Sequence, residues 1–132
     1  MRDRILLVED SPAIQNLLCH FLKKSPYTVD IAENGEEAIE TFSCGAYGLL
    51  LMDMEMPVMD GIEACKKIRV IEKENGCSAA SIVALTATEF AEDAPTLKEA
   101  GYNGYIPKPV TERVFLEAVE GFLNGGKGNK QA

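Results

Sequence analysis

Acidic side chains follow two apolar runs of this 132-residue chain, at the point where each run ends. Glu9 and Asp10 come directly after Ile5-Leu6-Leu7-Val8, and Asp53 comes directly after Leu49-Leu50-Leu51-Met52. Short, continuous apolar runs are typical of parallel strands that are buried on both faces. Because open α/β sheets bind ligands at the carboxyl ends of their strands, we expect these carboxylates to lie together in a functional site.

Two more polar side chains stand at the ends of later runs. Thr86 ends Ser81-Ile82-Val83-Ala84-Leu85, and Lys108 follows Gly104-Tyr105-Ile106-Pro107. Three neighbouring carboxylates would raise one another's pKa values unless a cation neutralised them, and hard oxygen ligands select Mg²⁺. A threonine hydroxyl can donate a hydrogen bond to a phosphoryl oxygen, and a lysine can pair with it. The set therefore predicts phosphoryl transfer onto a carboxylate nucleophile.

The apolar periodicity predicts the elements that position these side chains. Strands are expected over residues 4–8, 28–32, 48–53, 81–86 and 104–107, and helices over 12–24, 34 to about 45, 60–74, 96–100 and 111–123. Ser11 is the expected N-cap of the first helix, and Asp60, answered by Glu63, that of the third. Strands that alternate with helices indicate an α/β fold, a five-stranded parallel sheet with helices on both faces.

The start of the fourth helix is the least regular feature. A helix that began near Glu89 or Phe90 would carry Pro95 in its second turn, at a cost of roughly 3 kcal/mol. Proline is tolerated in a first turn, so we expect the regular helix to start at Asp93 or Ala94, after a loop or loose turn over residues 88–92.

Composition sets broad limits. The length fits one domain, 1–123, followed by a flexible C-terminal tail, 124–132, that has nothing to bury. The net charge of −8 argues against a nucleic-acid surface. No apolar run reaches membrane-spanning length and no signal peptide is visible, so a cytoplasmic protein is expected, with no membrane partner.

The cysteines and the single histidine are read as structural. Cys19, Cys44, Cys65 and Cys77 form no CxxC pair, and we expect free thiols in a reducing compartment, with Cys65 in a helix core. His20 falls in the first helix of an α/β pattern. A phosphotransfer histidine requires a helical bundle, so we assign it no relay role.

In combination, these motifs resemble the response-regulator receiver domains of two-component systems, both the single-domain chemotaxis regulator and the receivers of hybrid histidine kinases. The match covers roughly residues 4 to 123. It rests on Val8-Glu9-Asp10-Ser11, Met52-Asp53 through Met56-Pro57 to Asp60-Gly61, Ala84-Leu85-Thr86-Ala87 and Lys108-Pro109. Each motif alone is weak, whereas all of them in order are a specific signal. The resemblance implies the flavodoxin-like (βα)5 receiver fold.

The resemblance also implies a role for each site residue. Asp53 would be the phospho-acceptor, and Glu9 and Asp10 would hold Mg²⁺ with it, together with the backbone carbonyl of Glu55. Thr86 and Lys108 would hold the phosphoryl group. Tyr105 would be the aromatic switch that rotates when Thr86 shifts, and the Lys108-Pro109 bond would be cis.

Two other classes of protein share parts of the pattern. A haloacid-dehalogenase-type phosphatase also uses a strand-end aspartate, but it places an aspartate two residues later, where this chain has Glu55, and turnover of a general phosphomonoester would favour it. A flavodoxin-like cofactor carrier needs a glycine- and hydroxyl-rich phosphate loop where this chain has Glu9 and Asp10, which would repel a phosphate. A colourless protein would count against it.

The sequence therefore predicts a phosphorylation-dependent signalling switch. It would accept a phosphoryl group from a histidine kinase or phosphotransfer protein and would catalyse only its own phosphorylation and dephosphorylation. The resemblance implies that a downstream partner reads the face built from the fourth helix, fifth strand and fifth helix.

Overall fold

The computed structural model describes residues 4–42, 46–54, 61–77, 79–87, 94–108 and 111–124. Five strands and five helices alternate along them. The strands are β1 Arg4–Val8, β2 Thr28–Ala32, β3 Leu49–Asp53, β4 Ser81–Ala87 and β5 Gly104–Lys108. The helices are α1 Pro12–Leu22, α2 Gly35–Thr41, α3 Gly61–Asn75, α4 Ala94–Ala100 and α5 Glu112–Asn124. The predicted element order is confirmed throughout.

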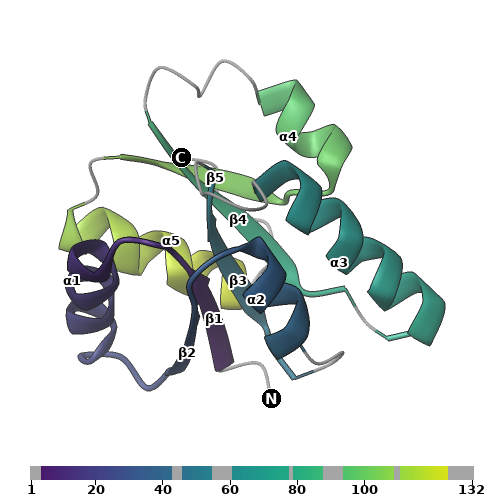
Figure 1. The fold of residues 1–132 in the computed structure, drawn as a ribbon. Coiled ribbons are helices and arrows are strands. Elements are labelled where there is room, and N and C mark those ends of the chain that lie inside the picture. The colour runs from purple at the N-terminus through teal and green to yellow at the C-terminus, as the bar shows by residue number, and fades with distance from the viewer. Residues whose placement is uncertain are drawn as a thin grey trace.

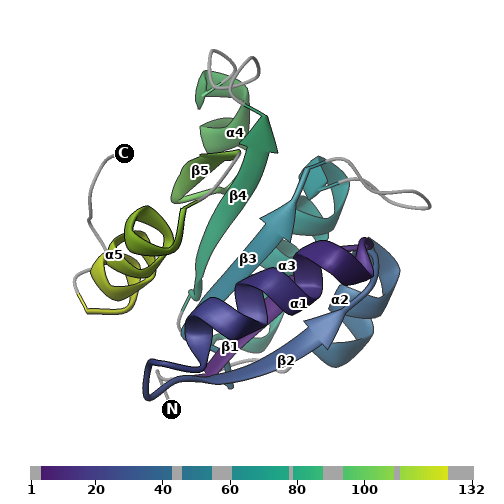
Figure 2. The same ribbon diagram turned by 90° about the vertical axis from the view of Figure 1, so that its left-hand side faces the viewer.

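The strands form one parallel sheet in the order β2-β1-β3-β4-β5. The arrows of β2, β3 and β4 point the same way in Figure 2, so the carboxyl ends of the strands share one edge of the sheet. β3 is the central strand, and all five of its residues are buried. This burial confirms the interpretation of its apolar run as a strand covered on both faces.

Helices cover both faces of the sheet, with α1 and α5 on one side and α2, α3 and α4 on the other (Figure 1). Alternate residues of each strand belong to two separate cores. Leu50 and Met52 of β3 pack in the α2–α3–α4 layer, whereas Leu49 and Leu51 pack in the α1–α5 layer. The two layers hold the strand ends rigidly in place, which is what a site built across several strands needs.

The helix starts follow the predicted capping residues where these are described. The Oγ of Ser11 accepts a hydrogen bond from the backbone N–H of Ile14, and Pro12 is the first residue of α1. Asn34 caps α2 by accepting from the N–H of Glu37. Asp60 lies outside the described residues, so its capping role stays a prediction. α1 ends at Leu22, two residues before the predicted end at Lys24.

The last two helices also fit their predicted positions. α4 is described from Ala94 to Ala100. Because residues 88–93 lie outside the described part of the chain, the predicted start at Asp93 or Ala94 stays a prediction. The predicted loop over residues 88–92 lies outside the described part of the chain. Thr111 Oγ1 accepts from the N–H of Val114 and so caps α5, which runs to Asn124.

The prediction for the cysteines needs one correction. Cys19 and Cys65 are free thiols, and Cys65 is buried in α3 as expected. Cys77, directly beyond the end of α3, is disulfide-bonded, so the predicted free thiol is wrong there. Disulfide formation depends on distance in the fold, and wide spacing along the chain does not prevent it. Cys44 lies outside the described residues. The cysteines therefore give no support to the prediction that the protein lies in a reducing compartment.

Candidate functional site

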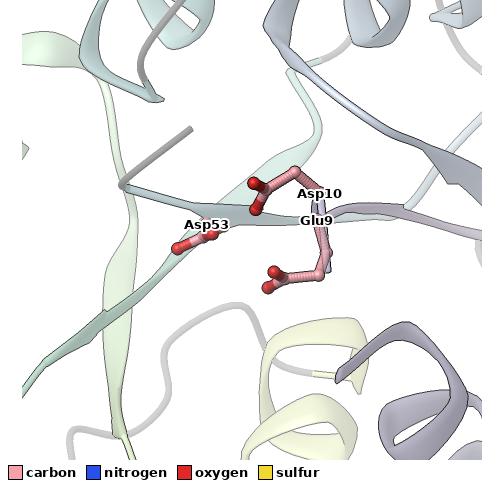
Figure 3. Close-up of side chains that lie close together, drawn as sticks. All are labelled: Glu9, Asp10 and Asp53. Carbon is pink, nitrogen blue, oxygen red and sulfur yellow. The ribbon is translucent and has the colours of Figure 1, made fainter. Parts of the chain in front are cut away.

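The carboxyl edge of the sheet brings three carboxylates together (Figure 3). Asp53 is the last residue of β3, and Glu9 and Asp10 directly follow β1, the neighbouring strand. One oxygen from each carboxylate lies within 4.8 Å of the others. Asp53 and Glu9 are buried, whereas Asp10 is exposed. The cluster predicted from the strand ends is therefore present.

The backbone after β1 is fixed by hydrogen bonds that hold Glu9 in place. Its N–H donates to the carbonyl of Ala32 over 3.0 Å, and its carbonyl accepts from Gln15 Nε2 over 2.6 Å. Its Oε2 accepts from the N–H of Ser11 over 3.1 Å. Gln15 was not predicted to contribute, since nothing in its spacing sets it apart from other polar residues of a first helical turn.

Lys108 supplies the positive charge of the cluster. It is the last residue of β5, and its Nζ lies 2.9 Å from Asp53 Oδ1. The Asp53 side chain is 4% exposed and that of Lys108 28% exposed, so water screens this ion pair only from one side. Lys108 and Asp53, both predicted to belong to this site, are therefore in direct contact. Pro109 lies outside the described residues, and the predicted cis bond stays a prediction.

Thr86 lies on β4, the strand next to β3 of Asp53, and Tyr105 lies on β5, one strand further along the sheet. Asp53 is in register with Leu85 of β4, so the buried Thr86 follows one residue beyond it. Tyr105 of β5 is in register with Ala84 of β4 and is half-buried against the core. The roles predicted for Thr86 and Tyr105 in phosphoryl binding and switching stay predictions. Glu55, the predicted carbonyl ligand, lies outside the described residues.

The electrostatics of the cluster suit a divalent cation. Burial, together with the charge of Asp53, raises the pKa of Glu9 to about 7. Glu9 Oε1 is buried and has no hydrogen-bond partner among the described residues. A buried carboxylate oxygen without a donor is costly unless another group satisfies it. Hard oxygen donors on Glu9, Asp10 and Asp53 fit Mg²⁺, which is held by few carboxylates.

A parallel (βα)5 sheet with an acidic cluster and a lysine at its carboxyl edge defines a class of phosphoryl-accepting signalling domain. Comparison with known proteins gives the same result. The sequence profile of the response regulator receiver domain matches residues 5–120. The chain therefore belongs to the response regulator receiver domain family, whose members are phospho-acceptor switches of two-component signalling and phosphorelays. This membership excludes both the phosphatase and the cofactor-carrier alternatives.

Individual relatives support this membership. The chain is 39% identical over 131 residues to hybrid signal transduction histidine kinase B of Dictyostelium discoideum, covering 92% of this chain and 7% of that kinase. It spans 13% of the sensor protein GacS of Pseudomonas syringae and 6% of hybrid signal transduction histidine kinase E of Dictyostelium discoideum. The chain is thus similar to a small part of these relatives' own length.

Two solved structures are close in fold. The receiver domain of Ssk1 from Saccharomyces cerevisiae, solved with the phosphotransfer protein Ypd1, gives a TM-score of 0.82 at 36% identity, covering 89% of this chain and 86% of that one. The receiver domain of a sensor histidine kinase from Pseudomonas aeruginosa gives a TM-score of 0.81 at 30% sequence identity. This match covers 95% of this chain and 100% of that one. A magnesium ion is coordinated in the active-site cleft of the second structure.

None of the helices in the described part of the chain combines the length and the apolar character that a membrane crossing requires.

Proposed function

We propose that Asp53 is the phospho-acceptor of this receiver domain and that Glu9, Asp10 and Asp53 hold Mg²⁺, with the Glu55 carbonyl as a further ligand. The observation that carries the proposal is the 2.9 Å contact of Lys108 Nζ with Asp53 Oδ1 inside the three-carboxylate cluster. When bound, Mg²⁺ neutralises negative charge on the carboxylates and on the phosphoryl group.

The chemistry at Asp53 needs only positioning and charge stabilisation from the protein. A phosphorus–oxygen bond forms to one Asp53 carboxylate oxygen while the phosphorus–nitrogen bond of a phosphohistidine donor breaks. The donor imidazole keeps the electron pair and takes up a proton. Lys108 pairs with a phosphoryl oxygen, and the Thr86 hydroxyl donates to another. The domain thus catalyses only its own phosphorylation by the donor and its own dephosphorylation.

The proposed partners follow from the same chemistry. The donor is a histidine kinase or a phosphotransfer protein, and the complex of the similar Ssk1 receiver with Ypd1 supports the second kind. The reader of the signal is a downstream partner on the face formed by α4, β5 and α5, where Tyr105 lies. Neither nucleic acid nor membrane is required, and a cytoplasmic location agrees with such partners.

Substitution of the acceptor tests this proposal directly. Asp53→Asn keeps the shape of the side chain but removes the nucleophile, so we expect no incorporation of phosphate from a small acyl-phosphate donor with Mg²⁺. Intact-protein mass spectrometry measures the incorporation. Asp30→Asn, which changes an aspartate of β2, is the control and should be phosphorylated normally. Mg²⁺-dependent incorporation that persists in Asp53→Asn would place the acceptor elsewhere.

A further inference from the structure

Tyr102 links the turn between α4 and β5 to the start of α3. Its hydroxyl donates a hydrogen bond of 2.7 Å to the carbonyl oxygen of Gly61, the first residue of α3, and this bond is buried. The Tyr102 side chain is 5% exposed. The two residues are 41 positions apart in the chain, and no motif marks Tyr102.

Gly61 lies in contact with the backbone of Asp53 as well. A methyl group on its Cα would stand 2.8 Å from the Tyr102 hydroxyl oxygen and 2.9 Å from the backbone carbonyl oxygen of Asp53. Both distances are too short for a carbon atom, so only glycine fits here without movement of a neighbour. Tyr102, Gly61 and the backbone of Asp53 therefore form one continuous packed path.

The turn that carries Tyr102 is itself anchored to α3 on both sides of the tyrosine. Arg69 donates to the carbonyl of Gly101 from Nε and Nη2, over 3.0 and 2.8 Å, and to Asn103 Oδ1 over 2.8 Å. Residues 101–103 are thus held at the middle of α3 by Arg69 and at its start by the tyrosine hydroxyl. The turn is therefore connected to Gly61 by a direct hydrogen bond.

The other side of Tyr102 faces the α4–β5 surface. With Leu97, Lys98, Asn103, Gly104 and Tyr105 it lines a cavity of about 360 Å³. The tyrosine therefore lies between the proposed partner surface and the backbone of the proposed acceptor.

We propose that Tyr102 is a positioning residue for phosphoryl transfer: its hydroxyl holds Gly61 against the backbone of Asp53 and couples the α4–β5 surface to the acceptor. This inference rests on the proposed role of Asp53. Catalytic rates depend steeply on such placement, because small displacements of a reacting group are costly. Coupling of this kind is reciprocal, so a change at Asp53 also alters the cavity.

Removal of one oxygen atom tests the coupling. Tyr102→Phe keeps the ring and its packing but deletes the hydrogen bond to Gly61. The matched control is Tyr47→Phe, since Tyr47 is also buried and donates a 2.7 Å hydrogen bond, to Asp30. We expect Tyr102→Phe to slow phosphorylation by an acyl-phosphate donor by roughly threefold to tenfold at saturating Mg²⁺. Tyr47→Phe should keep the wild-type rate constant. If the two variants have equal melting temperatures, the difference in rate does not come from a difference in stability.

A second readout does not require phosphorylation. The backbone amide signals of Asp53 and Met54 in NMR spectra should shift in Tyr102→Phe and stay in place in Tyr47→Phe. Unshifted signals, an unchanged rate constant, or equal effects of the two variants would each overturn the positioning role. If the wild-type protein accepts no phosphate, the proposed function is wrong. The amide signals would still show whether Tyr102 is coupled to Asp53.

Discussion

At the scale of single residues, the carboxylates of the acidic cluster repel one another, and a bound cation would reduce this repulsion. Glu9 combines a buried oxygen that lacks a donor among the described residues with the nearby charge of Asp53. The two effects favour the protonated form of Glu9, against the opposing charge of Lys108. The charge repulsion thus lies at the site that we propose for Mg²⁺.

This arrangement predicts a pH dependence of stability in the metal-free protein. The pKa of Glu9 is raised from 4.5 to about 7, so the folded state binds this proton more tightly than the unfolded state does. The contribution of Glu9 to stability is therefore largest below pH 4.5 and is lost as the pH rises to 7. We expect a decrease on the order of 2 kcal/mol, measured by urea unfolding in a chelating buffer.

Matched variants isolate the contribution of Glu9. Glu9→Gln removes the titrating group and should flatten this part of the profile. Glu63→Gln, which changes a carboxylate whose side chain is 56% exposed, should leave it unchanged. Mg²⁺ should restore stability above pH 7, because it binds the ionised carboxylates. A profile that is identical in Glu9→Gln and the wild type would contradict the assignment.

At the scale of elements, α3 is hydrogen-bonded to the segment before β4 and to the turn between α4 and β5. Besides its bonds to the α4–β5 turn, Arg69 Nη1 donates to Glu72 Oε1 and to the carbonyl of Ala80, both over 2.8 Å. Glu72 is itself buried and accepts from the N–H of Ala80 over 2.8 Å. One half-buried guanidinium thus ties α3 to the segments on both sides of β4.

Loss of this guanidinium should be costly. Arg69→Ala leaves the buried Glu72 carboxylate without this cationic partner and two backbone carbonyls without these donors. We expect a loss of about 2–4 kcal/mol in the free energy of unfolding, measured by chemical denaturation. Arg113→Ala is the control, because that side chain is 86% exposed and its pair with Glu117 should contribute about 0.5 kcal/mol or less. Equal losses in the two variants would show that Arg69 contributes no more to the free energy of unfolding than an exposed arginine does.

At the scale of the whole molecule, stability comes from two cores on opposite faces of one sheet. Phe115 of α5 is fully buried in the α1–α5 layer, and its ring centroid lies 5.8 Å from that of Phe21 in α1. The contact joins the two helices of this layer to each other. The integrity of that face therefore depends on a few aromatic anchors.

Truncation of this anchor should weaken the whole domain. Phe115→Ala removes a buried ring, and we expect a loss of about 3–5 kcal/mol, a large part of the stability of a typical domain. Thermal and denaturant unfolding measure the loss. The neighbouring Val114→Ala serves as control, since Val114 is 52% exposed and should change stability by no more than about 0.5 kcal/mol. A small effect of Phe115→Ala would mean that α5 is dispensable for this core.

The sequence alone determined the order of the elements and the residues of the acidic cluster. Continuous apolar runs identify buried parallel strands, and parallel strands must end at one edge, so the meeting of Glu9, Asp10 and Asp53 follows from local patterns. The predicted start of α4 rests on a similarly local reason, the tolerance of proline in a first helical turn.

Only the tertiary structure decided which distant side chains meet. Tyr102 and Arg69 lie in ordinary helical and turn sequence, and their importance comes from contacts that the packing of α3 against the α4–β5 turn creates. The disulfide at Cys77 also depends on the tertiary structure, because two sulfur atoms bond only where the fold brings them close together. Local patterns constrain backbone and burial, whereas contacts between segments depend on how the finished layers stack.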